Sequence, residues 1–373
     1  MRAQSFRSCV MFMAIAACAC SGGGGGSDST GPGNTNKTPA TFAGTFADSK
    51  SSGSMNVAVT PTAASLMLVP AGDVSAQTVA SGSATATLTF LNGSTTTMTG
   101  AYNAATSTLT LSGSGYAFTG AISASGMAGT YSGPNGSGNF TGQAPSSSGI
   151  AARTYCGTYE SGSDYGWFNM VVAAGGTNAS GLVVSLFSGA TSTGWSGLVS
   201  GSTVTGSTSA SVPVQGTLSA DGGSVSGTYA PSGSATGSGT FQASVAACPA
   251  AGATTIAGLW GTSIGLSTTI HFALTPSGSA VTGSGTLTVN FIVSYTGNEF
   301  TIDNGTISGS NVTFSGTLGA NPKTGGGFYY GAIAFSGTAT GNTMTGTLTF
   351  TPPRTDTQTF SAQTVTGVSL TRN

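Results

Sequence analysis

The sequence carries very little charge. Lys and Arg number 8 and Asp and Glu 9 in 373 residues, so charged side chains make up 5 % of the chain, against about a quarter in an average soluble protein. No stretch is basic enough to follow a nucleic-acid backbone or an anionic lipid surface. We therefore expect no nucleic-acid partner and a protein surface built from Thr, Ser, Gly and Asn.

Histidine is almost absent as well, since His271 is the only one. Imidazole is the usual general base and the commonest metal ligand. His271 alternates with the apolar Ile270 and Phe272, so we expect it on the outer face of a strand, solvated or locally hydrogen-bonded. No Gly-x-Ser-x-Gly turn accompanies it, and the glycine run at 22–26 lacks the lysine of a phosphate-binding loop.

Carboxylates form two close pairs. Glu160 and Asp164 flank one expected hairpin turn, and Glu299 and Asp303 flank another. Either pair has the chemistry for acid–base catalysis or calcium binding, but no Asp-x-Asp-x-Asp-Gly loop accompanies them. Two acids beside a turn are more often just solvated. We therefore expect no enzyme, no metal site and no cofactor.

The N-terminus has the pattern of a secretory signal. Arg2 and Arg7 precede a short apolar run, from Val10 to Ala17, which is too short to span a membrane. Ile15-Ala16-Ala17-Cys18 resembles the bacterial lipobox, which implies a signal peptide at 1–17 and an acylated Cys18. The same resemblance implies the outer membrane, because Ala19 rather than Asp follows Cys18. The alternative is an ordinary cleaved signal in which Cys18 and Cys20 have no role.

Residues 18–41 contain mainly Gly, Ser, Thr and Asn. Such a segment cannot bury an apolar face, and we expect a flexible tether with a root-mean-square span of roughly 25–30 Å. The predicted partner at this end is the membrane, through the lipid on Cys18.

Two cysteines remain beyond the tether. We expect Cys156 and Cys248 to form a disulfide outside the cytoplasm.

Three copies of one β unit follow the tether. Phe42 to Phe46, Tyr155 to Tyr159 and Ile256 to Trp260 each place large apolar residues around a glycine, and a second apolar strand follows each about ten residues later. The units are expected at 42–143, 154–248 and 255–373. In each, apolar and polar residues alternate, as between Thr85 and Phe90, which is typical of half-buried strands.

Turn signals separate these strands. They are Asn92-Gly93, Asn135-Gly136, Asp221-Gly222 and Asn304-Gly305. We expect about seven or eight strands in each unit, and an all-β fold of three tandem, small, antiparallel up-and-down β-barrels. A β-sandwich is the alternative, because its local pattern is nearly the same. Cys156 begins unit two and Cys248 follows its last strand, so their pairing requires a sheet that closes or folds over.

Outward aromatic residues are the best candidates for binding. The alternation around Phe168 places Trp167 on the outer face, and Tyr329 opposes Phe328 and Tyr330 in the same way. An exposed ring can stack on a sugar or anchor a protein. Packing against a neighbouring unit is the competing interpretation for each.

Two families share features with these units. Residues 131–142 resemble the strand-turn-strand that ends the barrel domains of surface lipoproteins similar to transferrin-binding protein B, which also follow the lipid cysteine with a glycine run, as at 22–26. Those turns carry alanine and glutamate where this chain has Gly136 and Ser137. Gly258-Leu259-Trp260 resembles the first strand of lipocalin-like barrels. Both resemblances imply binding rather than catalysis.

The expected function is therefore a membrane-anchored bacterial lipoprotein of the cell envelope, in the outer membrane, facing the periplasm or the surface. It would act as a non-catalytic binding module for a protein, a glycan or a small apolar ligand. The alternative is a structural spacer or adhesive coat protein with filled barrels.

Overall fold

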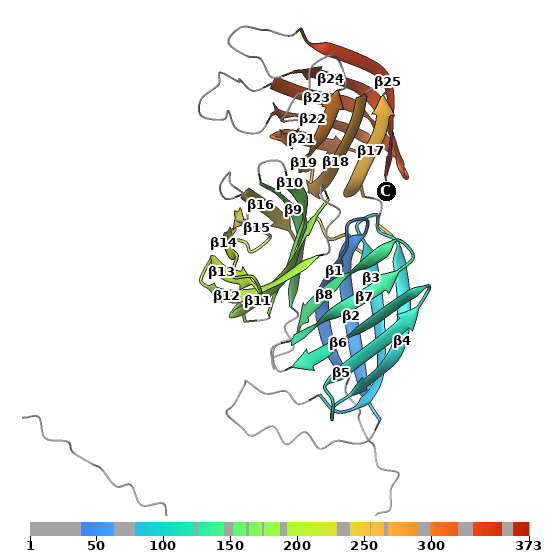
Figure 1. The fold of residues 1–373 in the computed structure, drawn as a ribbon, viewed down its shortest axis with the longest axis vertical. Helices are drawn as coiled ribbons and strands as arrows, with labels where there is room; N and C mark the ends of the chain where they lie inside the picture. Colours follow the sequence, from blue (N-terminus) through green and yellow to red (C-terminus); the bar gives the residue numbers. More distant parts are fainter. Residues whose placement is uncertain are drawn as a thin grey trace, which may run out of the picture. The chain divides into compact units, whose positions relative to one another are not determined.

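The computed structural model describes residues 39–62, 79–123, 126–144, 152–161, 164–173, 175–186, 192–229, 239–253, 255–264, 268–289, 299–319, 331–352 and 361–372. Within these ranges the regular secondary structure is all β, with no helix. The strands form three closed antiparallel barrels in chain order (Figure 1). The barrel prediction is confirmed, and the sandwich alternative is wrong because each sheet closes on itself.

Barrel 1 has the up-and-down order, in which each strand pairs with the next and β8 returns to β1. The pairing that closes it sets Phe46 of β1 opposite Phe140 of β8. Its strands are β1 (Ala40–Ala47), β2 (Ser52–Pro61), β3 (Gly82–Phe90), β4 (Thr95–Asn103), β5 (Thr108–Gly113), β6 (Tyr116–Ser123), β7 (Gly126–Gly133) and β8 (Gly136–Gln143).

Barrel 2 repeats this order and closes where β16 pairs with β9. Its strands are β9 (Arg153–Ser161), β10 (Asp164–Val172), β11 (Asn178–Ser185), β12 (Thr193–Ser200), β13 (Thr203–Thr208), β14 (Pro213–Leu218), β15 (Ser224–Tyr229) and β16 (Gly239–Ser244).

Barrel 3 closes through β17, which pairs with both β18 and β25. Its strands are β17 (Gly258–Ile264), β18 (Thr268–Ser277), β19 (Ala280–Val289), β20 (Glu299–Ile302), β21 (Asn304–Ser308), β22 (Asn311–Leu318), β23 (Gly331–Thr340), β24 (Thr343–Thr351) and β25 (Gln363–Arg372). Both β20 and β21 pair with β19 on one side and β22 on the other, so together they occupy one position in the ring.

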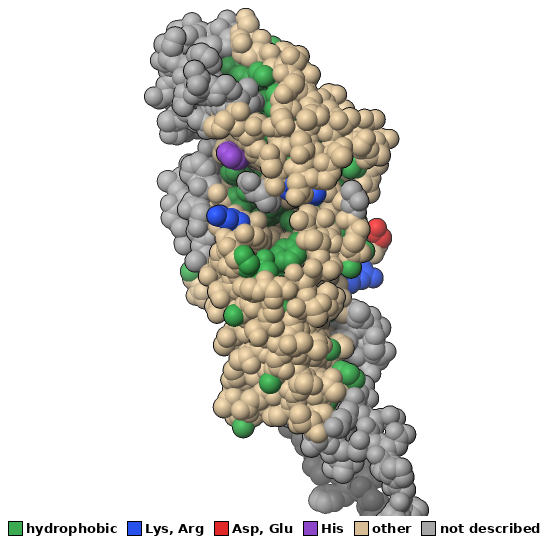
Figure 2. Space-filling model, turned by 90° about the vertical axis from the view of Figure 1, so that its right-hand side faces the viewer, with side chains coloured by type: hydrophobic (Ala, Val, Ile, Leu, Met, Phe, Trp, Pro, Cys, Tyr) green, Lys and Arg blue, Asp and Glu red, His purple; other side chains and the backbone are tan. Residues whose placement is uncertain are grey.

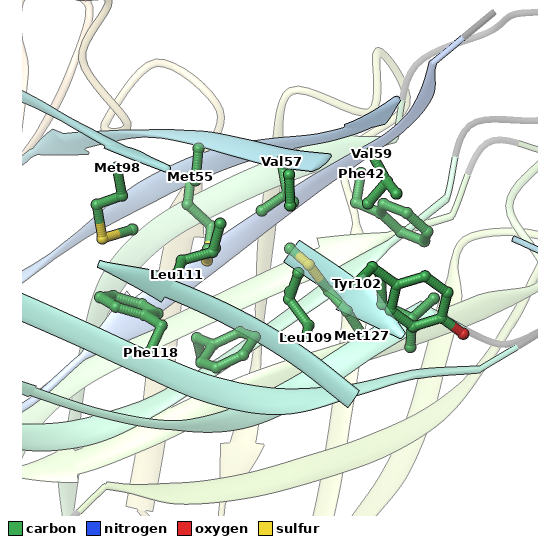
Figure 3. Packing of buried hydrophobic residues seen from close by; sticks show 14 of the residues in the cluster. Phe42, Met55, Val57, Val59, Met98, Tyr102, Leu109, Leu111, Phe118 and Met127 are labelled. Carbon is green, nitrogen blue, oxygen red and sulfur yellow. The ribbon is translucent and has the colours of Figure 1, made fainter. Parts of the chain in front are cut away.

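The period-two pattern determines which side chains fill the barrels. Along β3, Ala84, Ala86 and Leu88 are buried while Ser83 and Thr85 are exposed. In the interior of barrel 1, the side chains of Met55, Met98, Leu109, Leu111 and Phe118 come from four strands and pack together (Figure 3). Alternation alone therefore sorts the apolar side chains inward and the hydroxyl side chains outward.

In barrels 1 and 3, an aromatic ring of the interior lies over a pair of glycines on neighbouring strands. Gly120 and Gly129 face each other across β6 and β7, and a side chain on either would collide with the ring of Phe140. The ring of Phe335 lies in the same way over Gly337 and Gly346 in barrel 3. The missing side chains make room for the rings in a barrel of small diameter.

Three of the four predicted turns join strands. Asn92-Gly93 connects β3 to β4 with Gly93 at φ 82°, and Asp221-Gly222 connects β14 to β15 with Gly222 at φ 65°. Asn135-Gly136 connects β7 to β8. The fourth prediction is wrong, because Asn304 and Gly305 lie within β21, where both pair with β22.

The predicted disulfide is present. Cys156 and Cys248 are bonded with their Cα atoms 5.1 Å apart, across a sequence separation of 92 residues. Cys156 on β9 pairs with Ser244, the last residue of β16. The bond therefore spans the pairing that closes barrel 2.

We predict that replacing Cys156 and Cys248 together by serine lowers the free energy of unfolding of barrel 2 by about 4 kcal/mol, because the unfolded chain gains the entropy of a long open loop. Urea denaturation of the chain from Ser27, followed by tryptophan fluorescence, measures this change. Reduced wild-type protein is the matched control and should unfold with the double variant. An unchanged urea midpoint would contradict the prediction.

A buried carboxylate organises one end of barrel 1. Asp48, which is 2 % exposed, accepts hydrogen bonds from the backbone amides of Lys50 (2.7 Å) and Ser51 (2.6 Å) and from the Tyr131 hydroxyl (2.6 Å). Burial, and then the charge of Asp48, raises the pKa of Tyr131 well above its ordinary value of 10.0. Asp48 thereby links the β1–β2 turn to β7.

We predict that barrel 1 loses stability as the pH rises above about 10. Below this pH, Tyr131 is protonated in both the folded and the unfolded chain. Above it, only the unfolded chain releases the proton, so the free energy of unfolding falls. Tyr131→Phe should reduce this alkaline slope in urea denaturation between pH 8 and 11, and an identical slope in both proteins would refute the linkage.

Candidate functional site

The barrel interiors are occupied by the protein's own side chains. In barrel 2, the rings of Phe168 and Phe241 stack with centroids 3.8 Å apart, and Trp195 stacks on Phe168 at 5.6 Å. In barrel 3, Phe314 contacts Phe272 and Phe335, both at 5.3 Å. Because core side chains occupy the interiors, the outer faces are the candidate binding surfaces.

Trp167 points away from the interior of barrel 2, but it is only 2 % exposed. It belongs to an apolar cluster contributed by all three barrels, which we call the junction cluster: Ala47, Leu91, Cys156, Trp167, Leu182, Val184, Ala247, Ala257 and Ala273. The predicted use of Trp167 as an exposed binding platform is therefore wrong. The competing interpretation, packing against a neighbouring unit, describes its position.

Hydrogen bonds accompany the junction cluster where barrels 1 and 2 meet. The Asn169 amide donates to Ser52 Oγ (2.7 Å), and the Ser180 hydroxyl of barrel 2 accepts from Thr141 (2.9 Å) and Gln143 (3.0 Å) of barrel 1. Trp167 Nε1 and Asn169 Oδ1 are buried without a partner. Both lie on the outer face of β10, so covering that face leaves polar atoms unsatisfied at a cost of about 1–3 kcal/mol each.

A sequence signal for the junction was present. Every residue from Tyr165 to Val172 is buried, including Trp167 and Val171 on the outer face of β10. A strand that is apolar on both faces is covered on both sides. The alternation that placed Trp167 outward was correct, but the neighbouring outward valine indicated that this face would be buried.

The remaining predicted residues fall into two groups. Cys18 and Tyr329 lie outside the described residues, as do the side chains of Glu160, Asp164 and Glu299. His271 is exposed on β18, as predicted (Figure 2). It lies over Gly261 of the neighbouring strand. Asp303 is also exposed, but it lies in the strand position that β20 and β21 share rather than beside a hairpin turn.

The outer faces carry rows of uncharged polar side chains that run around the barrels. Register places Thr110, Thr119, Thr130 and Asn139 side by side across β5 to β8. Barrel 2 has the row Thr203, Thr217, Ser226, Gln242, and barrel 3 has Thr306, Thr313, Ser336, Thr347. Neighbours in such rows are about 4.8 Å apart. In Figure 2, uncharged polar groups and backbone cover most of the visible described surface.

Two of the shallow grooves on these outer faces differ in charge. One of about 370 Å³ crosses β1, β2 and β3 and is lined by residues including Thr41, Ala43, Asn56, Ala58, Thr85 and Thr87. The other, of about 260 Å³, crosses β22, β23 and β24 and includes Asp303. Asp303 gives the second groove a charged side chain, which the residues lining the first groove lack.

The described ranges contain no helix long and apolar enough to cross a membrane. Over the same part of the chain, no group of three or more His, Cys, Asp or Glu side chains is placed to hold a metal ion.

No family model matches the chain, and no curated protein does. The solved structures that resemble it include the vaccine antigen transferrin-binding protein B of Haemophilus parasuis Hp5, in a tryptophan-to-alanine mutant, and isotype 1 transferrin-binding protein B of serogroup B Neisseria meningitidis. The first is 10 % identical, with a TM-score of 0.21, and covers 90 % of this chain and 76 % of its own. The second is 12 % identical, with a TM-score of 0.20, and covers 90 % and 77 %. At these TM-scores the likeness carries no argument about ligand or partner.

We predict that Trp167→Ala weakens the contact between barrels, because it removes the largest side chain of the junction cluster, with a loss of about 3–5 kcal/mol. Limited proteolysis of the chain from Ser27 should then cleave between barrels at lower protease concentration. Leu198→Ala is the matched control, because Leu198 is 60 % exposed and its loss should change nothing. Equal cleavage of both variants and wild type would contradict this role for Trp167.

Proposed function

We propose that this chain is a non-catalytic protein of the bacterial cell envelope that binds its ligand on the outer faces of its barrels. One observation carries the proposal: side chains fill the three interiors, while the outer faces present uncharged hydroxyl rows and shallow grooves. A carrier of small apolar ligands needs an interior cavity. Of the three predicted ligand classes, a glycan or a protein therefore fits better than a small apolar molecule.

The proposal includes no catalysis. His271 is exposed, and among the described residues it belongs to no group of three or more His, Cys, Asp or Glu side chains. Asp48 is buried and its hydrogen bonds join elements of barrel 1. Neither residue has the arrangement of nucleophile, base and orienting group that hydrolytic catalysis uses.

The cellular address remains the one expected from the N-terminal pattern. Acylation at Cys18 and a tether at 18–41 would hold the barrels off the outer membrane, on its periplasmic or external side. An uncharged, hydroxyl-rich surface is compatible with either side of the membrane, because the interactions of uncharged groups depend little on ionic strength.

A structural spacer is the second candidate, and the junction favours it. Hydrogen bonds and the junction cluster tie the three barrels together instead of leaving them on free linkers. The linker after barrel 2 also contacts barrel 1, because the Gly252 amide donates a hydrogen bond to the Gly93 carbonyl (2.8 Å). Such an assembly would hold its two ends at a fixed separation.

We predict that the lipid-free chain from Ser27 shows its bare mass in native mass spectrometry and binds saturably to purified polysaccharide or protein fractions of the envelope in biolayer interferometry. The bare mass follows from the filled interiors. A small molecule that survives desalting would overturn the outer-face proposal. Absence of saturable binding to every fraction would leave the spacer function.

A further inference from the structure

The strand of barrel 3 formed by β20 and β21 contains one more residue than its neighbours. Phe300 lies opposite Leu318 and Asn304 opposite Ser315, so four steps along this strand match three along β22. On the other side, Ile302 lies opposite Gly283 and Thr306 opposite Ala280, again four steps against three. The extra residue is a β-bulge at Asp303, a feature that commonly redirects a side chain beside a functional site.

The bulge holds the Asp303 carboxylate on the outer face. The Asp303 amide donates to the Ser315 carbonyl (3.0 Å). Its carboxylate accepts from the Thr301 hydroxyl at Oδ1 (2.9 Å) and from the Thr317 hydroxyl at Oδ2 (2.7 Å). Asp303 and Asn304 are both exposed, so the extra residue is accommodated outside the barrel and the core is kept.

The groove beside this carboxylate has an apolar floor and a hydroxyl rim. Ala332 and Ala334 contribute methyl groups, and Ser315, Thr349 and Thr351 contribute hydroxyls. Cross-strand pairing aligns Ser315, Ala334 and Thr349 in one row. Gly316 adds no side chain, because the position of its Cβ would coincide with the Thr301 carbonyl. At about 260 Å³, the groove is smaller than a typical site for a drug-sized ligand, at roughly 300–1,000 Å³.

These groups match one kind of ligand. An ionised carboxylate has about four lone-pair sites, and the two threonine hydroxyls use two of them at Asp303. The remaining sites can accept two hydroxyl hydrogens from adjacent carbons of one ligand. No cationic side chain lines the groove, so an anionic ligand would be repelled without compensation. Alanine methyls suit the C–H face of a sugar ring, and Ser and Thr can donate or accept hydrogen bonds at its other hydroxyls.

We infer that the Asp303 groove across β22, β23 and β24 binds a neutral glycan through a hexose residue with two adjacent free hydroxyls. This inference rests on the proposed outer-face function and assigns it a place and a ligand class. Asp303 accepts the paired hydroxyls, Ala332 and Ala334 support the ring, and Ser315 and Thr349 set its orientation. Charge-assisted hydrogen bonds are about twice as strong as neutral ones, so Asp303 contributes most of the specificity.

The test uses the chain from Ser27 and a panel of neutral oligosaccharides, namely glucans, mannans and galactans, with affinities measured by isothermal titration calorimetry. Asp303→Asn removes the charge at nearly constant shape and should weaken binding on the order of tenfold. Ala334→Leu fills the floor and should abolish binding by a different route. Asp221→Asn is the matched control, since Asp221 is also exposed but lies in a turn of barrel 2, and it should bind like wild type.

The outcomes separate the inference from the proposed function. Weaker oligosaccharide binding by Asp303→Asn and Ala334→Leu, with wild-type affinity in Asp221→Asn, supports the inference. Equal affinity in wild type, Asp303→Asn and Ala334→Leu overturns it and leaves the outer-face function with another site. Binding of envelope fractions without binding of any neutral oligosaccharide also overturns it. Preference for a cationic peptide over the neutral panel, lost in Asp303→Asn, overturns the ligand class.

Discussion

The structure depends on how aromatic rings are accommodated inside small barrels. Phe140 and Phe335 each lie against inward-facing glycines on neighbouring strands, and Phe241 lies against Gly216. With any other residue at those positions, the ring and the strand backbone could not both fit. Glycine here is therefore a packing requirement, and it explains why a chain with 61 glycines still forms a dense apolar core.

Filled interiors move any function to the outer faces. Alternate residues of each strand point outward. These outward residues are mainly Thr, Ser, Asn and Gln, so the outer faces are polar but uncharged. Hydroxyl groups in these rows can hydrogen-bond to water, which compensates for the scarcity of charged side chains. The Asp303 carboxylate at the β20–β21 bulge contrasts with the uncharged side chains that line its groove, and that contrast is the basis of the assignment made for Asp303.

The barrels contact one another where the alternation of apolar and polar residues breaks down and apolar side chains point outward. On β10 and β11, Trp167, Val171, Leu182 and Val184 are apolar although they point outward, and all four are buried. Hydrophobic burial at this point brings three repeated units into contact. This burial leaves two polar atoms, Trp167 Nε1 and Asn169 Oδ1, without a hydrogen-bond partner.

The sequence by itself determined the all-β fold class, three of the four turns and the Cys156–Cys248 pair. These follow from the alternation of side chains, from glycine after Asn or Asp, and from the two cysteines that remain beyond the tether. Closure of each sheet into a barrel was decided by the tertiary structure, because a sandwich has nearly the same local pattern. Only the tertiary structure decided that Trp167 is buried, since the residues that pack against it are far away in the chain. It alone placed Asn304 and Gly305 in a strand and Asp303 at a bulge. A bulge is a difference in register between paired strands, and register depends on the partner strands as much as on the residues themselves.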